Sequence, residues 1–452
     1  MILTSQSAAG RSSASSKRGE LLQVLGVTFG IAVAIGAMIG VGILRAPSLI
    51  ARDVPDGYLI LGLWLIALLH AALEANVIAE LATSMPRAGG PYVYAHRAFG
   101  DVGGLVVGWT TWMQRVASTA ALSIAFAEFA AQLWPVLATA KPAIAVAIQL
   151  LMFGFNIAGV REGRAVQEIT SFLKAIALLG FCAAVYLFAA PQRPDGPHVA
   201  TIAGWGAIIA AYQLIVGAYS GWYEPAFFSE ETPNAARNLP RAMGIGLLLT
   251  AILYLGINAA LLHTLRPAEI ANYPLPFAAA LAGGGKYAVA GVAIFAMVSA
   301  ASCANAGIMS APRVLLALSR DGLLPAFFRC VNGGGSPAAA TIFTAAAAMV
   351  VALTGSFALA FGMIATLQSA SFVLVISALF VLRRREPGLL RPFRAIAYPW
   401  APLLVFAIDL GLLGLFLNAN RVGGLYAFLL WLLAVPFAIV ARRARWAGPA
   451  GV

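Results

Sequence analysis

Apolar stretches separated by short polar loops recur along the chain between residues 21 and 440. A helix that crosses a bilayer needs about 20 mainly apolar residues, and the stretches predict twelve such helices. The loops between them are short and contain proline, glycine or charged residues, as at 85–91, 160–164 and 319–325. The pattern therefore predicts an all-α integral membrane protein with 12 transmembrane helices.

Two of the predicted helices carry glycines where a membrane helix would normally continue. These glycines lie at residues 36–42 in the first helix and at 217–221 in the sixth. Non-helical backbone at membrane depth survives only where it is buried in protein or lines a polar cavity. Discontinuous helices at matching places in two halves indicate the substrate site of a secondary transporter. Alternatively the glycines allow close helix packing, since Gly36 and Gly40 have small-xxx-small spacing.

Charge placement indicates the topology. Charged residues make up only 10% of the 452 positions, against about 25% in soluble domains. The net charge of +12 comes from 29 basic residues, of which the topology places twenty on one face and six on the other. This bias follows the positive-inside rule, so we expect both termini in the cytoplasm and no nucleic acid partner.

The first and sixth helices would enter the membrane from opposite sides, which predicts a 5+5 inverted repeat with discontinuous helices 1 and 6. Two further helices would follow the second repeat. The expected divisions are a disordered cytoplasmic tail (1–20), a first repeat (21–190), a second repeat (191–395), two C-terminal helices (396–441) and a cytoplasmic tail (442–452).

No enzymatic or metal-binding pattern is evident. The three cysteines and four histidines have no ligand spacing, and neither H-E-x-x-H nor G-x-S-x-G occurs. Residues 283–287 lack the spacing of a phosphate-binding loop. We therefore expect no enzyme activity, no cofactor and no metal, and a channel is disfavoured because no filter-like segment is present.

Four motifs occur in a consistent order and on consistent sides of the membrane. They lie at residues 38–43 (MIGVGI), 79–94 (with AEL and PRAGGPYVY), 218–240 (with AYSGW, EE and RNLP) and 319–325 (SRDGLLP). Together they resemble the amino acid-polyamine-organocation (APC) superfamily of permeases, in its amino acid permease branch, over about residues 21–394.

The resemblance implies a substrate site at the two interruptions. Amides at the start of a half-helix suit a carboxylate, and carbonyls at the end of one suit an ammonium group. By resemblance the carboxylate is assigned to the amides of Gly40, Val41 and Gly42. The remaining substrate-binding candidates are Met38, Gly217, Ala218, Tyr219 and Ser220, and the gate or specificity candidates are Trp222 and Glu224.

Two departures from the family pattern bear on the substrate. Gly217 stands where many relatives carry an aromatic gate, and Val41 replaces a frequent small polar residue. Gating can then move to Tyr219, Trp222 or Tyr223. The sequence leaves these alternatives open.

Lys174 lies among apolar residues in the fifth helix, where a charge is costly and usually functional. It matches a lysine of the family's fifth helix. The resemblance implies that its ammonium group replaces the cation that sodium-coupled relatives hold between the first and eighth helices. We expect a sodium-independent carrier with Lys174 as a fixed or titrating cation; the alternative is a lysine that snorkels to a nearby interface.

Other charged residues in the apolar segments need partners. His70 and Glu74 have the spacing of a pair on one helix face, with a proton-handling or a structural role. Arg115 and Glu128 are too far apart to pair with each other. Glu224 either binds a cationic substrate or belongs to a gate, and we favour the gate. We expect Asp409 near a membrane boundary.

The predicted function is alternating-access transport of amino acids across the cytoplasmic membrane, coupled to protons or by exchange. Neutral L-amino acids are the first expectation for the substrate. Cationic amino acids or polyamines are the alternative, as is a non-transporting amino acid sensor. The partners are the substrate, protons and the lipid bilayer.

Overall fold

A computed structural model describes residues 21–189, 191, 204–273, 275–281, 285–353 and 357–419, which contain helices and no strand. The predicted twelfth helix and both tails lie outside this part of the chain. The helices are α1 (Val27–Met38), α2 (Val41–Asp53), α3 (Gly57–Ser84), α4 (Pro91–Leu133), η1 (Pro135–Ala140), α5 (Lys141–Ala158), α6 (Val160–Phe188), α7 (Trp205–Tyr219), η2 (Glu224–Glu231), α8 (Ala235–Thr264), α9 (Pro267–Asn272), α10 (Pro276–Ala280), α11 (Gly285–Arg320), η4 (Ala326–Arg329), α12 (Ala338–Leu353), α13 (Phe357–Arg385) and α14 (Trp400–Ala419).

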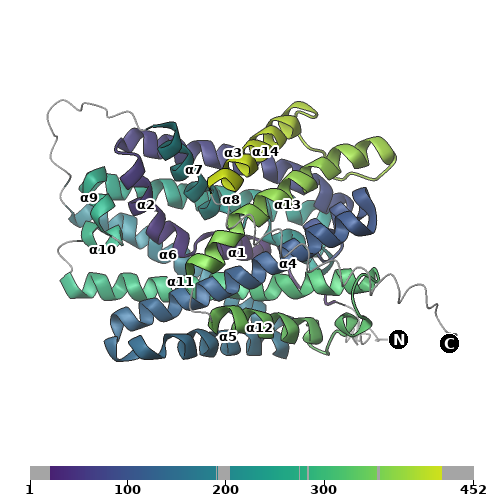
Figure 1. The fold of residues 1–452 in the computed structure, drawn as a ribbon, viewed down its shortest axis with the longest axis horizontal. Coiled ribbons are helices and arrows are strands. Elements are labelled where there is room, and N and C mark those ends of the chain that lie inside the picture. The colour runs from purple at the N-terminus through teal and green to yellow at the C-terminus, as the bar shows by residue number, and fades with distance from the viewer. Residues whose placement is uncertain are drawn as a thin grey trace, which may run out of the picture.

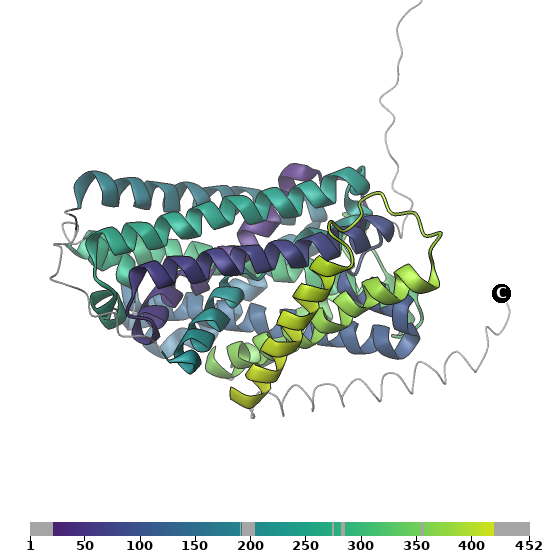
Figure 2. The same cartoon turned by 90° about the horizontal axis from the view of Figure 1, so that it is seen from above.

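The long helices run roughly parallel or antiparallel to one another, with α4 and α11 packed together through the centre (Figure 1). Helices α5 and α12 cover one side of this central pair. Helices α3, α7 and α8 lie on the other side, and α14 crosses the edge of the bundle against α3 and α13 (Figure 2). The short helices α9 and α10 pack against α2 at one end of the molecule.

Seven helices are long and apolar enough to cross a membrane, and the bent pair α1–α2 forms an eighth candidate, within the described residues. Helices α7, α12 and α14 are shorter. Each of the first eleven predicted segments coincides with helical structure. Residues 160–164, predicted as a loop, instead form the start of α6. Helix α4 begins at the end of the loop predicted at 85–91 and is kinked at Gly100, whose φ is +73°.

Side chains follow the reverse of the pattern in soluble proteins. On α6, Leu173 and Ile176 are 51% and 66% exposed, whereas Lys174 between them is fully buried. Large apolar side chains also face outward on α3 and α8, such as Leu69 and Leu248. Apolar residues outside and polar residues inside are what a lipid environment requires.

Ion pairs join the segments at one end of the bundle. Glu80, at the end of α3, pairs with Arg383 and Arg391. Arg97 pairs with Glu386 just beyond α13, and this hydrogen bond lowers the pKa of the Glu386 carboxyl group. These contacts tie the start of α4 and the end of α3 to the end of α13.

The most deeply buried of these pairs joins η2 to α11. Glu231 accepts two hydrogen bonds from Arg313, at 2.9 and 3.0 Å, and the two side chains are 0% and 3% exposed. Replacing Glu231 with glutamine leaves a buried guanidinium without its counter-charge, which typically costs about 3–5 kcal/mol.

We therefore expect Glu231→Gln to lower the apparent melting temperature of the purified protein strongly, measured by loss of the monodisperse peak after heating. The matched control is Glu168→Gln, which breaks the more exposed pair of Glu168 with Arg164 on α6. Such a pair is worth about 0.5 kcal/mol, so the control should melt near the unmodified protein. Equal melting of both variants would contradict a structural role for the buried pair.

Candidate functional site

The first predicted interruption is present in the structure. Helix α1 ends at Met38, α2 begins at Val41, and the two are bent by 40°. Gly40 is the N-cap residue of α2 and is extended, with no side-chain cap. The first amides of a helix lack intrahelical partners, so the start of α2 offers hydrogen-bond donors and the positive end of a helix dipole.

The second interruption begins three residues later than the glycine pattern predicts. Helix α7 continues through Gly217 and ends at Tyr219, and the chain resumes as a 3-10 helix, η2, from Glu224. The Gly217 carbonyl oxygen accepts a hydrogen bond from the Ser220 amide nitrogen at 3.2 Å. Gly221 has φ of +128°, a conformation that suits glycine and turns the chain out of the helix.

The two interruptions touch each other. A Cβ atom on Gly221 would lie within 2.9 Å of the Ala37 carbonyl carbon and the Met38 amide nitrogen. One at Gly42 would lie 3.8 Å from Ala218. Segments 180 residues apart in sequence therefore meet backbone to backbone, and glycine is what permits the contact.

A tyrosine of α8 bridges the two helix ends. The hydroxyl group of Tyr254 lies 2.6 Å from the Met38 carbonyl oxygen and 3.1 Å from that of Ala218. A tyrosine hydroxyl has one proton, and each carbonyl oxygen has two lone pairs. Both carbonyls therefore keep acceptor capacity for a second donor.

Lys174 holds the end of α1. Its ammonium group donates to the carbonyl oxygens of Gly36 and Ile39, both at 2.7 Å, and the side chain is fully buried, so it does not snorkel. Ser299 and Cys303 of α11 also donate to these carbonyls. The ammonium thus lies between α1 and α11 and satisfies carbonyls that the interruption leaves without intrahelical partners.

Close packing also explains one of the glycines. A Cβ atom on Gly36 would fall 1.9 Å from the amide nitrogen of Gln167 and 2.3 Å from the Ser171 hydroxyl oxygen, both on α6. Gly36 is therefore a packing position. The glycines at 40 and 221 lie at the interruptions themselves.

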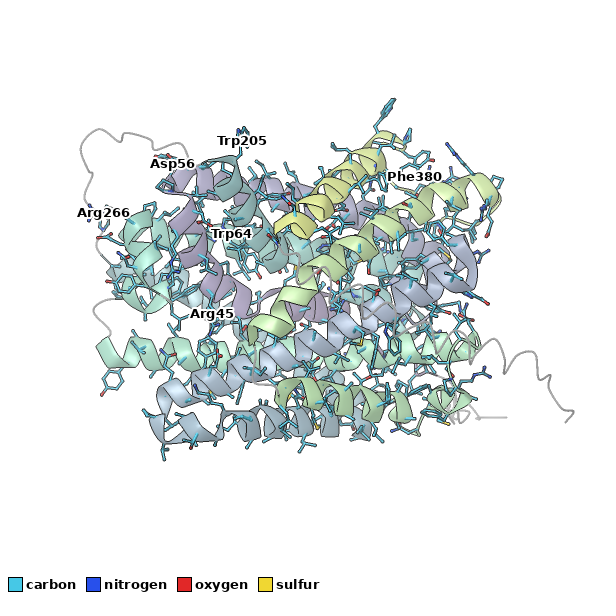
Figure 3. The ribbon with its side chains drawn as sticks, in the orientation of Figure 1. Arg45, Asp56, Trp64, Trp205, Arg266 and Phe380 are labelled. Carbon is cyan, nitrogen blue, oxygen red and sulfur yellow. The ribbon has the colours of Figure 1, made fainter. Side chains whose placement is uncertain are left out.

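Two aromatic residues beside the junction carry polar atoms without partners. The Tyr219 ring packs against Trp64 of α3 and Tyr254, with centroids 5.7 and 5.3 Å apart. Trp64 is fully buried (labelled in Figure 3), and its helix packs against α7. The Tyr219 hydroxyl and the Trp64 indole nitrogen are buried and have no hydrogen-bond partner among the described residues. Such groups are usually satisfied, so they are available to a ligand.

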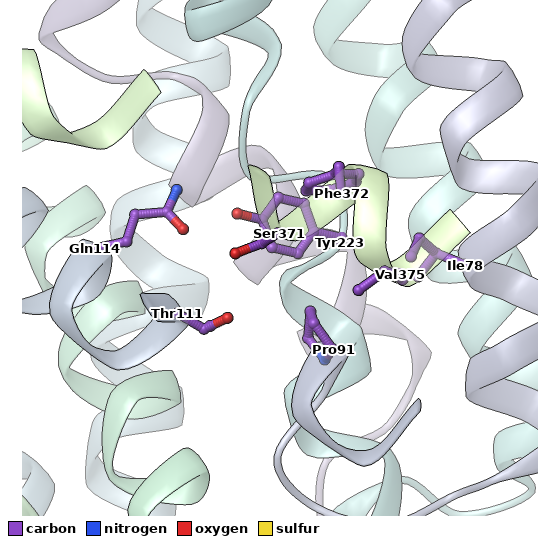
Figure 4. A pocket seen from close by; sticks show the side chains of 8 residues that line it. All are labelled: Ile78, Pro91, Thr111, Gln114, Tyr223, Ser371, Phe372 and Val375. Atoms are coloured by element: carbon purple, nitrogen blue, oxygen red, sulfur yellow. The ribbon is translucent and has the colours of Figure 1, made fainter. Parts of the chain in front are cut away.

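Polar side chains connect the second interruption to α13 and α4. Ser220 exchanges hydrogen bonds with Gln368, which accepts another from Gln114. Nearby, the polar ends of Gln114, Tyr223 and Ser371 point into a cavity of about 10 Å³ (Figure 4). A cavity of this size has room for about one water molecule.

The gate candidates follow α7: Trp222 lies in the turn and Glu224 begins η2. Trp222 is buried against Tyr223 and Phe372, with ring centroids 5.3 and 5.9 Å apart. Glu224 is fully buried and forms an ion pair with Arg115 of α4. Glu224 is therefore the counter-charge that Arg115 needs within an apolar segment.

The remaining intramembrane charges are also paired. Glu128 binds Arg45 at 3.0 Å. The prediction for Asp409 is wrong: it is 4% exposed and contacts His70, with the Nε2–Oδ1 atoms 3.1 Å apart. Helix α14 packs against α3, which brings this carboxylate inside.

Sequence reasoning missed Tyr254 and Gln368. Both are polar residues within apolar segments, and such residues usually face the bundle interior. That signal was present in the sequence, but it does not identify the backbone groups that these side chains contact.

Comparisons with known proteins agree with one another. The Amino acid permease family model matches residues 25–440. The serine/threonine exchanger SteT of Bacillus subtilis (strain 168) is 28% identical over 433 residues, 92% of this chain and 96% of the exchanger. The branched-chain amino acid permease BcaP of the same organism is 29% identical, over 88% of each chain. The mouse b(0,+)-type amino acid transporter 1 is 25% identical, over 88% of this chain and 83% of the transporter.

Proposed function

The chain belongs to the amino acid permease family of the APC superfamily, and from this premise we propose that it moves amino acids across the cytoplasmic membrane by alternating access. The observation that carries the proposal is the junction of the two interruptions. Backbone amides at the start of α2 and carbonyls at the ends of α1 and α7 meet there. These groups match the carboxylate and ammonium groups of an α-amino acid.

We propose the following architecture: 12 transmembrane helices, a 5+5 inverted repeat over 21–190 and 191–395, and both termini in the cytoplasm. The arrangement of α1–α2 and α7–η2 supports this. Both are interrupted where they contact each other, as expected for the two discontinuous helices of such a repeat.

Transport is proposed to be sodium-independent, by exchange or with protons. The support comes from Lys174, whose ammonium group lies between α1 and α11 on the carbonyls of Gly36 and Ile39. A fixed positive charge there would compete with a sodium ion for the same oxygen atoms.

Neutral L-amino acids are the proposed substrates. The relatives named for serine, threonine and branched-chain amino acids support this class. A polyamine or cationic amino acid would need an acceptor for its second charge. One candidate, Glu224, is already paired with Arg115, which supports its assignment to a gate.

Proteoliposomes containing the purified protein test the proposal. We expect a labelled neutral L-amino acid to enter, with uptake unchanged when sodium is replaced by potassium. Unlabelled neutral amino acids should compete, and polyamines should not. Competition by polyamines alone would favour the amine carrier, and ligand binding without flux would favour a sensor; either result would contradict the proposal.

A further inference from the structure

A second buried polar cluster joins α3 to α14. The cluster consists of His70 and Glu74 of α3 and Asp409 of α14. One imidazole nitrogen and one oxygen of each carboxyl group lie within 4.8 Å of one another. Their exposed fractions are 3%, 7% and 4%. Burying two carboxyl groups together at membrane depth is expensive.

The charge balance of the cluster requires protons. With both carboxylates ionised and the imidazole neutral, the cluster would carry two negative charges in an apolar surrounding. Asp409 Oδ2 is buried with no hydrogen-bond partner among the described residues, and an ionised oxygen there would be uncompensated. A proton bound within the cluster removes one charge and supplies a donor between the two carboxyl groups.

Among the described residues, few other ionisable groups lie close enough to change the charge balance of this cluster. From α7, the Tyr212 hydroxyl lies 3.2 Å from His70 Nδ1, with the rings stacked 6.3 Å apart. Tyr223, in the turn after α7, is within electrostatic reach of Glu74. Arg383 of α13 pairs with Glu80 of α3. Glu80 lies six residues beyond Glu74, which is about 9 Å along the helix at 1.5 Å per residue.

The cluster also touches the second interruption. The indole group of Trp222, in the turn between α7 and η2, lies within interaction range of the Glu74 carboxyl group. Tyr212 belongs to the helix that leads into the same turn. A change in the protonation of Glu74 or Asp409 therefore changes the groups that hold this turn against α3.

We propose that His70, Glu74 and Asp409 form a proton-binding site, distinct from Lys174, whose occupancy is coupled to movement of the turn at Trp222. The proposal rests on the transport function proposed above. The proton belongs to the cluster as a whole, since strongly interacting groups titrate together. Its binding forms one O–H or N–H bond within the cluster and its release breaks that bond, while α7 and its turn rearrange during the transport cycle.

Replacing each carboxylic acid with its amide tests the site, because the side chain keeps its size but can no longer bind or release the proton. In proteoliposomes, Glu74→Gln and Asp409→Asn should retain exchange of labelled for unlabelled amino acid at equal pH. They should lose accumulation driven by an inward acid gradient. For a gradient of about one pH unit, loss of one coupled proton lowers accumulation about tenfold. Glu168→Gln, which changes a partly exposed carboxylate of α6, is the control and should accumulate normally.

Infrared titration gives a readout that needs no transport. The unmodified protein should show a protonated carboxyl C=O band that both amide variants reduce. Unchanged gradient-driven accumulation in both variants, or absence of this band, would overturn the proposal, as would a stoichiometric metal ion retained through purification and lost in Asp409→Asn. If the unmodified protein exchanges no amino acid while the band titrates, the transport function fails and the proton site stands.

Discussion

Replacing Lys174 with methionine should reduce amino acid uptake by about 30-fold or more, the factor expected when two buried carbonyl groups each lose a hydrogen bond from a charged donor, worth about 1–3 kcal/mol. The Gly36 and Ile39 carbonyls both lie 2.7 Å from the ammonium nitrogen. Without it, these carbonyls keep only the neutral donors Ser299 and Cys303, and the end of α1 compensates by extending the helix or admitting water. Either change moves the neighbouring Met38 carbonyl out of the substrate junction. Initial uptake rates in proteoliposomes measure the effect.

Lys141→Met is the matched control for this substitution. Lys141 is exposed at the start of α5, and its replacement removes the same charge and leaves the junction intact. Its uptake should remain within about twofold of the unmodified protein, the scatter of ordinary surface substitutions. Both variants should elute as single peaks, which separates lost function from lost folding. Unchanged uptake and an unchanged pH response in Lys174→Met would exclude this role for the lysine.

The sequence predicted the helices well because membrane spans are set by length and apolarity. Helix α3, for example, is 28 residues long and ends directly before the loop predicted at 85–91. The first interruption was predicted because three glycines gather within 36–42. The second interruption falls within the predicted 217–221 but begins only after Tyr219, because Gly217 is compatible with a helix. The chain then turns at Gly221, whose positive φ no local pattern specifies.

Partners distant in sequence were the part that could not be predicted. Arg115 and Glu224 each required a counter-charge, but they are 109 positions apart and pair only because α4 packs near η2. His70 and Asp409 are separated by 339 positions. We predicted Asp409 near a membrane boundary because a carboxylate in an apolar segment is expected to reach water when no partner can be identified from the sequence.

Gly221→Ala should abolish transport, because both the backbone conformation and the space at this position exclude a side chain. The φ of +128° is strained for alanine. Its Cβ would also lie 2.9 Å from two backbone atoms of residues 37 and 38, which cannot move aside as a side chain can. The substitution therefore forces the two interruptions apart, and the amides of α2 and the carbonyls of α7 no longer converge on one ligand.

Gly180→Ala provides the comparison for this effect. Gly180 lies within α6, and a Cβ atom there meets nothing within 4 Å, so the change adds a helix-favouring residue at an open position. We expect normal uptake and ligand binding for Gly180→Ala. Gly221→Ala should show neither, even where size-exclusion chromatography finds it folded. Binding of labelled amino acid to the purified protein separates a lost site from a blocked cycle. Retained affinity in Gly221→Ala would mean that the substrate does not depend on contact between the two interruptions.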